Sequence, residues 1–442
     1  MAISPARTAA FDILLRVEER DSYASELLHS NRLEKLSSSD RGLTTELVMG
    51  VLRWRSRLNE AIIAASARPL AKVDPEVLIA LRLGAYQLRY LNRIPAHAAI
   101  DESVELVKRA RKRSAAPFAN AVLRKIAATH AEAIPEPEQW TAELLAREFA
   151  QPAWLAERWV AEYGVERTSL ICRHNQSVPD TAIRLDDQDV AAELTATGVE
   201  LAPGALLRNA RIIIAGDITR THALQEGRVF IQDEGSQLVA ALVGSGSRLL
   251  DCCAAPGGKT SALAWRNPTA EIIAAELHAH RAELLRRRVR AANVQVIQAD
   301  ALNLPPLGNF DRVLADVPCS GTGTLARNPE IKWRLTPTDL DELHARQTAL
   351  LRAALDRLAP GGRAVYSTCS LEREENENVI EEVLAQSEGV HLLDCREALQ
   401  QLQMSGELLW KDMESLASGK FLRTIPGVHP CDGFFAALIE RA

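Results

Sequence analysis

Two cysteines in this chain of 442 residues have the surroundings of nucleophiles. Cys319 follows the apolar run that ends at Asp316, and Cys369 follows another apolar run fifty residues later. Such runs predict buried strands, and we expect these two to be neighbours in one sheet. A single cysteine in a sheet is most often a small buried hydrophobe, but two at the ends of neighbouring strands would face one cleft. A thiolate there could add to an electron-poor carbon of a substrate.

A glycine-rich loop within residues 249–260 has the pattern of a ligand site. An apolar run ends at Asp251, the chain turns through residues 256–258 (Pro-Gly-Gly), and an Ala- and Leu-rich run follows. This pattern predicts a buried strand, a tight loop and a helix, with the loop at the carboxyl end of the strand, where open α/β sheets bind ligands. The two glycines would let a ligand approach the backbone closely.

Acidic residues end several of the apolar runs. Glu276, Asp300 and Asp316 each stand where a predicted strand ends, beside Asp251 in the same sheet. One such acid is often a helix cap, but carboxylates at successive strand ends favour a nucleoside site. Glu276 could accept hydrogen bonds from both ribose hydroxyls, and Asp300 could reach the adenine end.

Two cofactors compete for this loop. Residues 258–260 (Gly-Lys-Thr) resemble the end of a phosphate-binding loop, and Asp316 resembles the magnesium-binding Asp at the end of a strand, so ATP is one alternative. The full phosphate motif, however, needs a glycine where Cys253 stands, and Pro256 removes an N–H that a phosphate would use. A dinucleotide motif G-x-G-x-x-G is absent. The pattern therefore favours a nucleoside without phosphates, and S-adenosylmethionine (SAM) fits.

A thiolate and a methyl donor together suit the methylation of an unactivated pyrimidine carbon. Carbon 5 of cytosine is a poor nucleophile, but a thiolate that adds to carbon 6 makes carbon 5 enamine-like and able to attack a sulfonium methyl group. An acid near ring nitrogen 3 neutralises the developing charge, and a base then removes the carbon-5 proton so that the thiolate leaves. The spacing alone does not say which cysteine attacks.

The composition indicates a soluble protein of two or three domains. The chain is too long for one core, is 47% hydrophobic and 25% charged, and has no apolar run of membrane-spanning length. Its start lacks the features of a signal peptide, so we expect a cytoplasmic location. The seven cysteines form no C-x-x-C pair and H-E-x-x-H is absent, which argues against disulfides and zinc, and we expect no metal.

The net charge of −6 does not indicate a nucleic-acid binder, but the charge is uneven. Basic residues concentrate in 108–113 and 286–290, and acidic residues in 372–382. Local basic patches decide phosphate contact more than the total charge does. A single basic run is as readily a solvated helix face.

The first 130 residues predict helices only, because apolar residues recur at helical spacing without a strand pattern. The helix start signals are Ser4-Pro5, Ser39 or Asp40, and Asp74-Pro75. Further helices are expected near 96–112 and 117–129. A stiff polar segment at 134–138 then predicts a linker.

A small α+β module is predicted next. Helix returns at 139–165 with Trp140, Trp154 and Trp159, which we expect in the core because they stand among Leu and Ala at helical spacing. Short strands follow near 181–185, 211–214 and 228–232, with glycine or proline between them.

From residue 248 onward strands and helices alternate, which predicts an α/β domain with a mostly parallel sheet covered on both faces. The expected strands are 248–251, 271–276, 294–299, 310–316, 362–368 and 433–439. The expected helices are 260–266, 279–292, 337–359 and 375–387. We expect the last strands, after Pro426-Gly427, to form an antiparallel hairpin at the edge of the sheet.

Motifs in both halves of the chain resemble known families. The front half resembles the NusB-type RNA-binding helical domain over nearly all of 1–130, through Asp40-Arg41, Glu46-Leu47, Gly50, Arg53, 81–84, Pro95 and 120–124. The rear half resembles the RNA cytosine-5 methyltransferases, through Gln232-Asp233, Ser236-Gln237, 251–260, 316–319, 321–323, 329–333, 368–370, Glu375-Asn376 and 432–435. Joined in one chain, the two resemble the ribosomal small-subunit methyltransferase B family, also called Sun/Fmu.

The resemblance implies three domains and one reaction. The domains are a NusB-like helical domain (1–133), the connecting α+β module (139–235) and a Rossmann-like SAM-dependent methyltransferase domain (236–442). The implied reaction transfers a methyl group from SAM to carbon 5 of a cytosine in 16S rRNA through a covalent cysteine–cytosine intermediate. The implied partner is 16S rRNA or a small-subunit assembly intermediate, without membrane or metal, and we expect a monomer.

The resemblance also implies roles for individual residues. It implies Cys369 as the nucleophile, Cys319 as the thiol that helps to release the product, and Asp316 as the acid at the cytosine edge, with Lys259 near both cofactor and base. The implied SAM pocket consists of Cys253, Ala254, Ala255, Pro256, Gly257, Gly258, Lys259, Glu276, Asp300 and Asp316. In this family an Asp is more usual than Glu276, and a glycine is common where Ala299 stands, so cofactor affinity could differ.

Three alternatives stay open. DNA cytosine methyltransferases use the cysteine that follows proline as their nucleophile, which would make Cys319 the attacker. An ATP-dependent RNA-remodelling enzyme would use residues 258–260 and Asp316. A noncatalytic NusB-like assembly or transcription factor is the third alternative, and the intact Cys319 and Cys369 argue against it.

Overall fold

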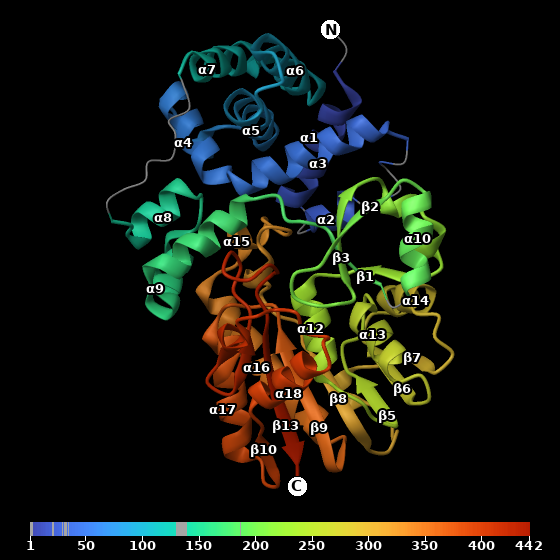
Figure 1. The fold of residues 1–442 in the computed structure, drawn as a ribbon. Helices are drawn as coiled ribbons and strands as arrows, with labels where there is room; N and C mark the ends of the chain where they lie inside the picture. The colour runs from blue at the N-terminus through green and yellow to red at the C-terminus, as the bar shows by residue number, and fades with distance from the viewer. Residues whose placement is uncertain are drawn as a thin grey trace. The chain divides into compact units, whose positions relative to one another are not determined.

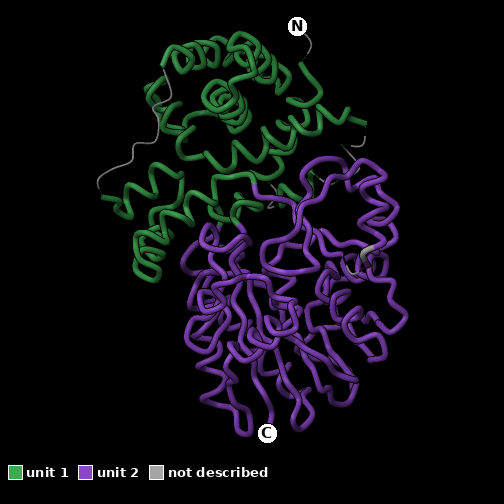
Figure 2. Tube along the Cα trace, viewed as in Figure 1, with its two compact units in different colours: residues 1–178, 325–334 green, residues 179–324, 335–442 purple. Residues whose placement is uncertain are grey.

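A computed structural model of the protein describes residues 3–19, 22–28, 30, 33, 35–129, 139–185 and 187–442. The predicted linker at 134–138 lies outside the described residues. The chain divides into two compact units, shown in different colours in Figure 2: residues 1–178 and 325–334 form unit 1, and residues 179–324 and 335–442 form unit 2. The helices after residue 139 therefore group with the front of the chain, and the strands after residue 181 group with the rear.

Unit 1 is helical in its described residues, as the sequence predicts. Its helices, labelled in Figure 1, are α1 (Pro5–Glu19), α2 (Ala24–Leu28), α3 (Ser38–Arg53), α4 (Arg55–Ser66), α5 (Pro75–Tyr90), α6 (Ala96–Arg109), α7 (Ala116–Ala128), α8 (Ala142–Glu148), α9 (Ala153–Gln176) and α15 (Ile331–Arg334). The predicted cap of α3 was wrong by two residues: the Ser37 hydroxyl, rather than Ser39 or Asp40, accepts the N–H of Asp40. Helices α2 and α4 were not predicted.

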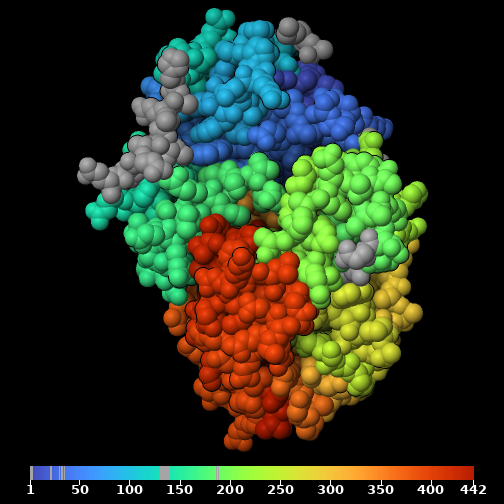
Figure 3. All heavy atoms as spheres, viewed as in Figure 1, coloured from blue at the N-terminus to red at the C-terminus, as the bar shows by residue number. Residues whose placement is uncertain are grey.

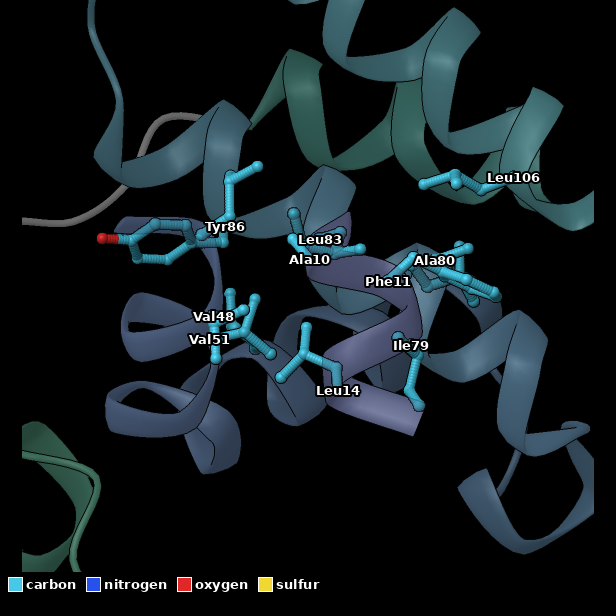
Figure 4. Close-up of a cluster of buried hydrophobic side chains, with 14 of the residues drawn as sticks. Ala10, Phe11, Leu14, Val48, Val51, Ile79, Ala80, Leu83, Tyr86 and Leu106 are labelled. Atoms are coloured by element: carbon cyan, nitrogen blue, oxygen red, sulfur yellow. The ribbon is translucent and has the colours of Figure 1, made fainter. Parts of the chain in front are cut away.

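The core of unit 1 is built from the apolar stripes of its first helices. Figure 4 shows Leu14 of α1 beside Val48 and Val51 of α3, Phe11 of α1 near Ala80 of α5, and Tyr86 of α5 at one side of the group. These positions recur every three or four residues, so each helix buries one face. Burial of this stripe, rather than helix propensity, is the main source of stability for helices of this length.

The three tryptophans of the α8–α9 region differ in burial. Trp159 is 1% exposed and lies in the core, as expected. Trp140 and Trp154 are half-buried. Trp140 packs against Phe149, with ring centroids 5.5 Å apart, and the Arg173 guanidinium lies 5.7 Å from its ring. The expectation of a core position was therefore correct for one of the three.

A ten-residue segment, 325–334 (the inserted segment), belongs to unit 1 although the chain on both sides of it belongs to unit 2. Lys332 Nζ donates to the carbonyl of Arg53 at 3.1 Å, and Trp333 Nε1 donates to the carbonyl of Leu52 at 2.6 Å, both at the C-terminal end of α3. Glu330 accepts the first N–H of α2 at 2.7 Å. The Lys332 and Trp333 donors satisfy carbonyls that have no partner within the last turn of α3, and the Glu330 carboxylate complements the dipole at the N-terminus of α2.

Unit 2 contains a small antiparallel sheet with strand order β2-β3-β1-β4. Its elements are β1 (Ala182–Leu185), α10 (Gln188–Ala196), β2 (Glu200–Pro203), β3 (Ala210–Ala215), α11 (His222–Gln225) and β4 (Val229–Ile231). The three predicted strands are present. The edge strand β2 was missed, because it is short, partly exposed and ends in proline, and proline lowers a strand signal.

The second sheet of unit 2 has the strand order β11-β12-β13-β9-β8-β5-β6-β7, with β10 pairing to β13. The strands are β5 (Arg248–Asp251), β6 (Glu271–Glu276), β7 (Val294–Gln298), β8 (Phe310–Asp316), β9 (Leu358–Thr368), β10 (Val390–Leu392), β11 (Ala417–Ser418), β12 (Phe421–Arg423) and β13 (Phe435–Arg441). The helices are α12 (Glu234–Leu242), α13 (Gly258–Arg266), α14 (Ala279–Arg288), α16 (Pro337–Leu355), α17 (Glu377–Gln386) and α18 (Cys395–Met404). Strands β9, β8, β5, β6 and β7 are parallel, which confirms the predicted α/β, Rossmann-like class.

The predicted hairpin after Pro426-Gly427 at the sheet edge was wrong. Strand β13 lies inside the sheet, antiparallel to β9 on one side and to β12 on the other. The first five residues of β13 are buried, and such a two-sided apolar run suits an interior strand. The turn through residues 426–427 connects β12 to β13, and the edge consists of β11 and β12.

Residues near the C-terminus, red in Figure 3, also form a continuous part of the visible surface of unit 2.

Within the described ranges, every helix is too short or too polar to cross a membrane.

Candidate active site

The two cysteines meet at the carboxyl ends of neighbouring parallel strands. Strands β8 and β9 pair with Asp316 opposite Ser367, and the loops that follow them carry Cys319 and Cys369. The two Sγ atoms are 3.3 Å apart, and the backbone N–H of Cys369 donates to Cys319 Sγ at 3.3 Å. The shared register of the strands therefore brings together two thiols that are far apart in the sequence.

The surroundings of Cys319 favour its neutral form. The hydrogen bond with Cys369, burial, and the negative charges of Cys369 and Glu375 raise the pKa of Cys319 well above its ordinary value. A carboxylate close to a thiol disfavours the thiolate, because the two like charges repel. Cys319 is therefore a thiol at neutral pH and can donate its proton toward the Cys369 sulfur.

Lys259 and Asp316 form a partly buried ion pair beside the cysteines. Lys259 Nζ donates to Asp316 Oδ2 at 2.8 Å, and the Ser367 hydroxyl donates to Asp316 Oδ1 at 2.6 Å. Burial lowers the pKa of Lys259, but the charge and hydrogen bond of Asp316 outweigh it, so the pKa is raised overall. The Lys259 ammonium also lies 5.1 Å from the Phe434 ring centroid. Both oxygens of Asp316 thus accept hydrogen bonds, and the proton of the pair resides on Lys259.

A cavity of about 330 Å³ opens beside this pair and the two thiols. It is lined by Cys252, Cys253, Ala255, Glu276, Leu277, His278, Arg281, Ala299, Asp300, Ala301, Asp316, Val317, Pro318, Cys319, Arg346, Leu350 and Cys369. The volume lies in the range of small-molecule sites. Three carboxylates in the lining disfavour phosphate groups and suit a ligand with hydroxyls and positive charge, so the residues present fit SAM.

The carboxylates of the cavity are held by local backbone contacts. Glu276, at the end of β6, is 4% exposed, and its Oε1 accepts the N–H of His278 at 2.9 Å. Arg281 Nε lies 3.9 Å from Glu276 Oε2. The expectation that Asp300 ends its strand was wrong: β7 ends at residue 298, and Asp300 caps the next turn by accepting the N–H of Leu302 at 3.0 Å. Asp300 still lines the cavity.

The glycine-rich loop is shaped by packing within the protein. Gly257 has φ 107°, and a Cβ there would lie 2.7 Å from Val289 Cγ2 and 2.8 Å from Leu285 Cδ1. We expected this position to be glycine so that a ligand could approach the backbone. The structure gives two other reasons: the positive φ favours glycine, and a side chain would collide with Leu285 of α14 and with Val289. Of the loop residues in the predicted SAM pocket, Cys253 and Ala255 line the cavity. Ala254, Pro256, Gly257, Gly258 and Lys259 are not among the lining residues.

The groups that an ATP site would need are engaged elsewhere. Lys259 pairs with Asp316, and the Thr260 hydroxyl donates to Asp251 Oδ2 at 2.7 Å. Arg184 Nη1 donates to the carbonyl of Gly258 at 2.7 Å. Asp251 is 1% exposed and is not part of the cavity lining. Burial, together with the charge of Asp316, raises the pKa of Asp251 to about 7, although the hydrogen bond from Thr260 opposes the shift. The geometry therefore does not favour a phosphate-binding loop.

Sequence reasoning missed several residues of this site. Arg281 and Arg346 line the cavity, and Ser367 bonds Asp316. Glu375 stands in a resemblance motif, yet its contacts with the cysteine loops were not predicted. One sequence signal could have pointed to Glu375: it stands only six residues after Cys369. It also lies in a run of acidic residues, and such a run usually indicates a solvent-exposed helix face. Within the described residues, no group of three or more His, Cys, Asp or Glu side chains could hold a metal ion.

Comparisons with known proteins agree with this architecture. A family model described as 16S rRNA methyltransferase RsmB/F matches residues 242–440, and the NusB family model matches residues 4–128. The "Probable ribosomal RNA small subunit methyltransferase B" of Bacillus subtilis is 35% identical over 398 residues, which are 86% of this chain and 88% of that protein. The "Ribosomal RNA small subunit methyltransferase B" of Pseudomonas syringae is 34% identical over 377 residues, which are 82% of this chain and 83% of that protein.

A solved structure is also similar. A methyltransferase homologue from Pyrococcus horikoshii is 28% identical, with a TM-score of 0.54, and covers 67% of this chain and 98% of that chain. The two family models together match both halves of the sequence, and the Bacillus relative spans most of both proteins. The chain therefore belongs to the ribosomal RNA small subunit methyltransferase B family, a family of SAM-dependent rRNA methyltransferases.

Proposed function

We propose that the protein transfers a methyl group from SAM to carbon 5 of a cytosine in 16S rRNA through a covalent cysteine–cytosine intermediate. The observation that carries this proposal is the contact between the Cys319 and Cys369 sulfurs, 3.3 Å apart at the rim of a cavity with three carboxylates. An enzyme that methylated an already nucleophilic atom would need neither thiol, whereas carbon 5 of cytosine needs one to activate it.

In this proposal Cys369 is the nucleophile. Its thiolate, formed by loss of the thiol proton to the solvent, adds to carbon 6 of the cytosine. The electron pair of the 5,6 double bond shifts into the 4,5 bond, and negative charge develops on ring nitrogen 3. The proton that Lys259 shares with Asp316 is close to the thiols, and this pair serves as the acid near ring nitrogen 3, where it neutralises the developing charge. Bound SAM supplies the electrophilic methyl group. The Glu276 and Asp300 carboxylates bind its nucleoside hydroxyls and adenine end.

Cys319 serves product release. After methylation, the carbon-5 proton must leave so that the carbon–sulfur bond to Cys369 can break and the 5,6 double bond can re-form. The Cys319 sulfur accepts that proton as a thiolate, after its own proton has passed to the solvent. Burial and the nearby Glu375 charge raise the pKa of Cys319 and so oppose this first proton loss, and for the same reason they make the thiolate a strong base once it forms. We place the reaction in the cytoplasm, on 16S rRNA or a small-subunit assembly intermediate, with the protein as a monomer.

Methyl transfer from labelled SAM to unmodified 16S rRNA, followed by mapping of the modified base, tests the proposal. Wild-type protein should form 5-methylcytosine at a discrete position. Transfer to a ring or exocyclic nitrogen would contradict it. Magnesium-dependent binding of ATP without binding of SAM would favour the RNA-remodelling alternative instead.

Two cysteine variants separate the roles of the thiols. Cys369→Ala should bind SAM, form no adduct and make no 5-methylcytosine, because it lacks the nucleophile. Cys319→Ala should still attack and transfer the methyl group but then stall, so that methylated RNA migrates with the protein on a denaturing gel. An adduct that forms in Cys369→Ala and is absent from Cys319→Ala would reverse the two roles.

A further inference from the structure

One fully buried carboxylate joins the two loops that carry the cysteines. Glu375 lies in a 3-10 turn (Arg373–Glu375) just before α17 and is 0% exposed. Its hydrogen-bond partners in the described part of the chain are all neutral donors. Burial of a charge without a cation costs free energy unless hydrogen-bond donors surround it. The presence of a carboxylate at this position therefore needs an explanation.

The donors to Glu375 come from three different elements. The backbone N–H of Ser320 donates to Oε1 at 2.7 Å, and the hydroxyls of Ser320 and Ser370 both donate to Oε2. Gln347 Nε2, on α16, donates to Glu375 Oε1 and to the carbonyl of Pro318, each at 2.9 Å. The carboxylate thus bridges the loop after β8 to the loop after β9.

Ser320 and Ser370 directly follow Cys319 and Cys369 in the sequence. A tie between the two serines therefore sets the distance between the two sulfurs. We propose that Glu375 is a positioning residue: its carboxylate holds the two loops together so that the sulfurs of Cys319 and Cys369 stay in contact, and it acts on Cys319 through this geometry and through its charge. Its importance for turnover rests on the proposed function, but its effect on the thiols does not.

The charges around the two sulfurs are unequal. Glu375 lies on the side of Cys319 and helps to raise the pKa of that thiol, together with Cys369 and burial. Lys259, paired with Asp316, interacts electrostatically with Cys369. A negative charge near the Cys319 thiol favours its protonated form, because the thiolate would face a like charge. The Tyr366 hydroxyl donates to the Glu375 carbonyl at 2.6 Å, and Tyr366 also interacts electrostatically with Cys319. Cys253, Asp316 and Arg346 line the same cavity as Cys319.

Alkylation of the thiols tests this inference without RNA or SAM. The full-length protein is treated with iodoacetamide across a pH range, and peptide mapping by mass spectrometry reports Cys319 and Cys369 separately. In Glu375→Gln the midpoint for Cys319 should move down by about one pH unit, since a nearby charge has been removed. Glu381→Gln removes an exposed carboxylate of α17 and should leave both midpoints unchanged. An unchanged Cys319 midpoint in Glu375→Gln would overturn the electrostatic role.

Turnover tests the geometric role. Glu375→Ala removes the carboxylate bridge, although the direct contact between the Ser320 and Ser370 hydroxyls (3.1 Å) can remain. The variant should lower kcat by about 100-fold, the cost expected when reacting groups move by roughly 1 Å. Glu375→Gln keeps the size and an acceptor oxygen and should recover part of that loss, with SAM affinity unchanged in both. A Glu375→Ala kcat no lower than that of Glu381→Gln would overturn the positioning role. If wild-type protein makes no 5-methylcytosine, the proposed function fails while the alkylation result still stands.

Discussion

At the residue scale, the carboxylates of the cavity should determine cofactor affinity. Glu276 is nearly buried and lines the cavity, and Arg281 Nε forms an ion pair with its Oε2 at 3.9 Å, a separation too long for a hydrogen bond. We predict that Glu276→Ala weakens SAM binding by roughly 10- to 100-fold, the loss of one or two hydrogen bonds to a charged group. Isothermal titration calorimetry with SAM measures this change.

The matched control for this prediction stands on the same strand. Glu271 begins β6 and Glu276 ends it, so Glu271→Ala removes a carboxylate at the opposite end of the sheet, where its partner is Arg248. SAM affinity should stay at the wild-type value in Glu271→Ala. Equal losses in the two variants would mean that the effect reflects strand stability rather than ligand contact.

At the element scale, three loops at one end of the large sheet are joined through their backbones. The N–H of Gly323 donates to the carbonyl of Cys369 at 2.9 Å, and the N–H of Gly433 donates to the carbonyl of Gly323 at 2.8 Å. A Cβ on Gly323 would lie 2.3 Å from the oxygen of Gly433 and 2.8 Å from that of Cys369. Both contacts are to backbone atoms, so a side chain fits only if a loop moves.

We predict that Gly323→Ala destabilises the protein by about 1–3 kcal/mol, the usual cost of overpacking, and lowers kcat because the Cys369 loop shifts. Urea unfolding and steady-state kinetics measure the two effects. Gly42→Ala is the control, because nothing lies within 4 Å of a Cβ there and α3 should gain slightly from alanine. Wild-type stability and activity in Gly323→Ala would show that the loops tolerate the displacement.

The inserted segment gives a second prediction at this scale. Burial, together with the charge of Arg53, lowers the pKa of Lys332 to about 7, although Cys172 opposes the shift. In the unfolded chain the lysine keeps its ordinary pKa, so between about pH 7 and 10 the unfolded state binds one more proton than the folded state. The free energy of unfolding should therefore rise with pH, by at most about 1.4 kcal/mol per pH unit.

In Lys332→Met this contribution is absent. The stability of Lys332→Met, expressed as its free energy of unfolding minus that of wild type, should be highest near pH 7. This difference should fall toward pH 9, because wild type gains stability as the pH rises and the variant does not. Chemical denaturation at several pH values measures the difference. Lys108→Met, at a side chain that is 43% exposed, should show no such trend; the same trend in both variants would contradict the assignment to a buried amine.

At the scale of the whole molecule, the front of the chain is less separable than the linker at 134–138 suggests. Unit 1 extends to residue 178 and includes the inserted segment, which donates hydrogen bonds to α3 through Lys332 and Trp333. The cavity lining lies entirely within unit 2. Removal of the first helices, including α3, should therefore leave the cofactor site intact. It should also remove the hydrogen-bond acceptors of Lys332 and Trp333 in the inserted segment.

We predict that a fragment beginning at residue 139 still binds SAM, engages RNA more weakly and with a shallower salt dependence, and is cut by trypsin after Arg327, Lys332 or Arg334. The full-length protein should resist cleavage at these positions, because Lys332 is 1% exposed. Calorimetry, RNA binding at several salt concentrations and limited proteolysis measure the three effects. Unchanged RNA affinity in the fragment would contradict an RNA-binding role for the front half.

Local patterns in the sequence determined which elements form and which chemistry they carry. Alternating apolar runs and helical stripes predicted the parallel strands, and a thiol, a carboxylate or a glycine turn at each strand end predicted the kind of site, because these signals act over a few residues. Family resemblance added the choice between Cys319 and Cys369, which spacing alone did not supply.

Tertiary structure decided what depends on neighbours distant in the sequence. It inserted β13 between β9 and β12, gave Leu285 and Val289 the space beside Gly257, and buried Glu375 under both cysteine loops. It also joined the inserted segment to unit 1. Strand order and long-range packing depend on which surfaces bury one another best. The local sequence of one segment does not specify the distant segment against which it packs. For that reason the protonation of Cys319, which depends on Glu375 and Cys369 together, could be read only from the folded chain.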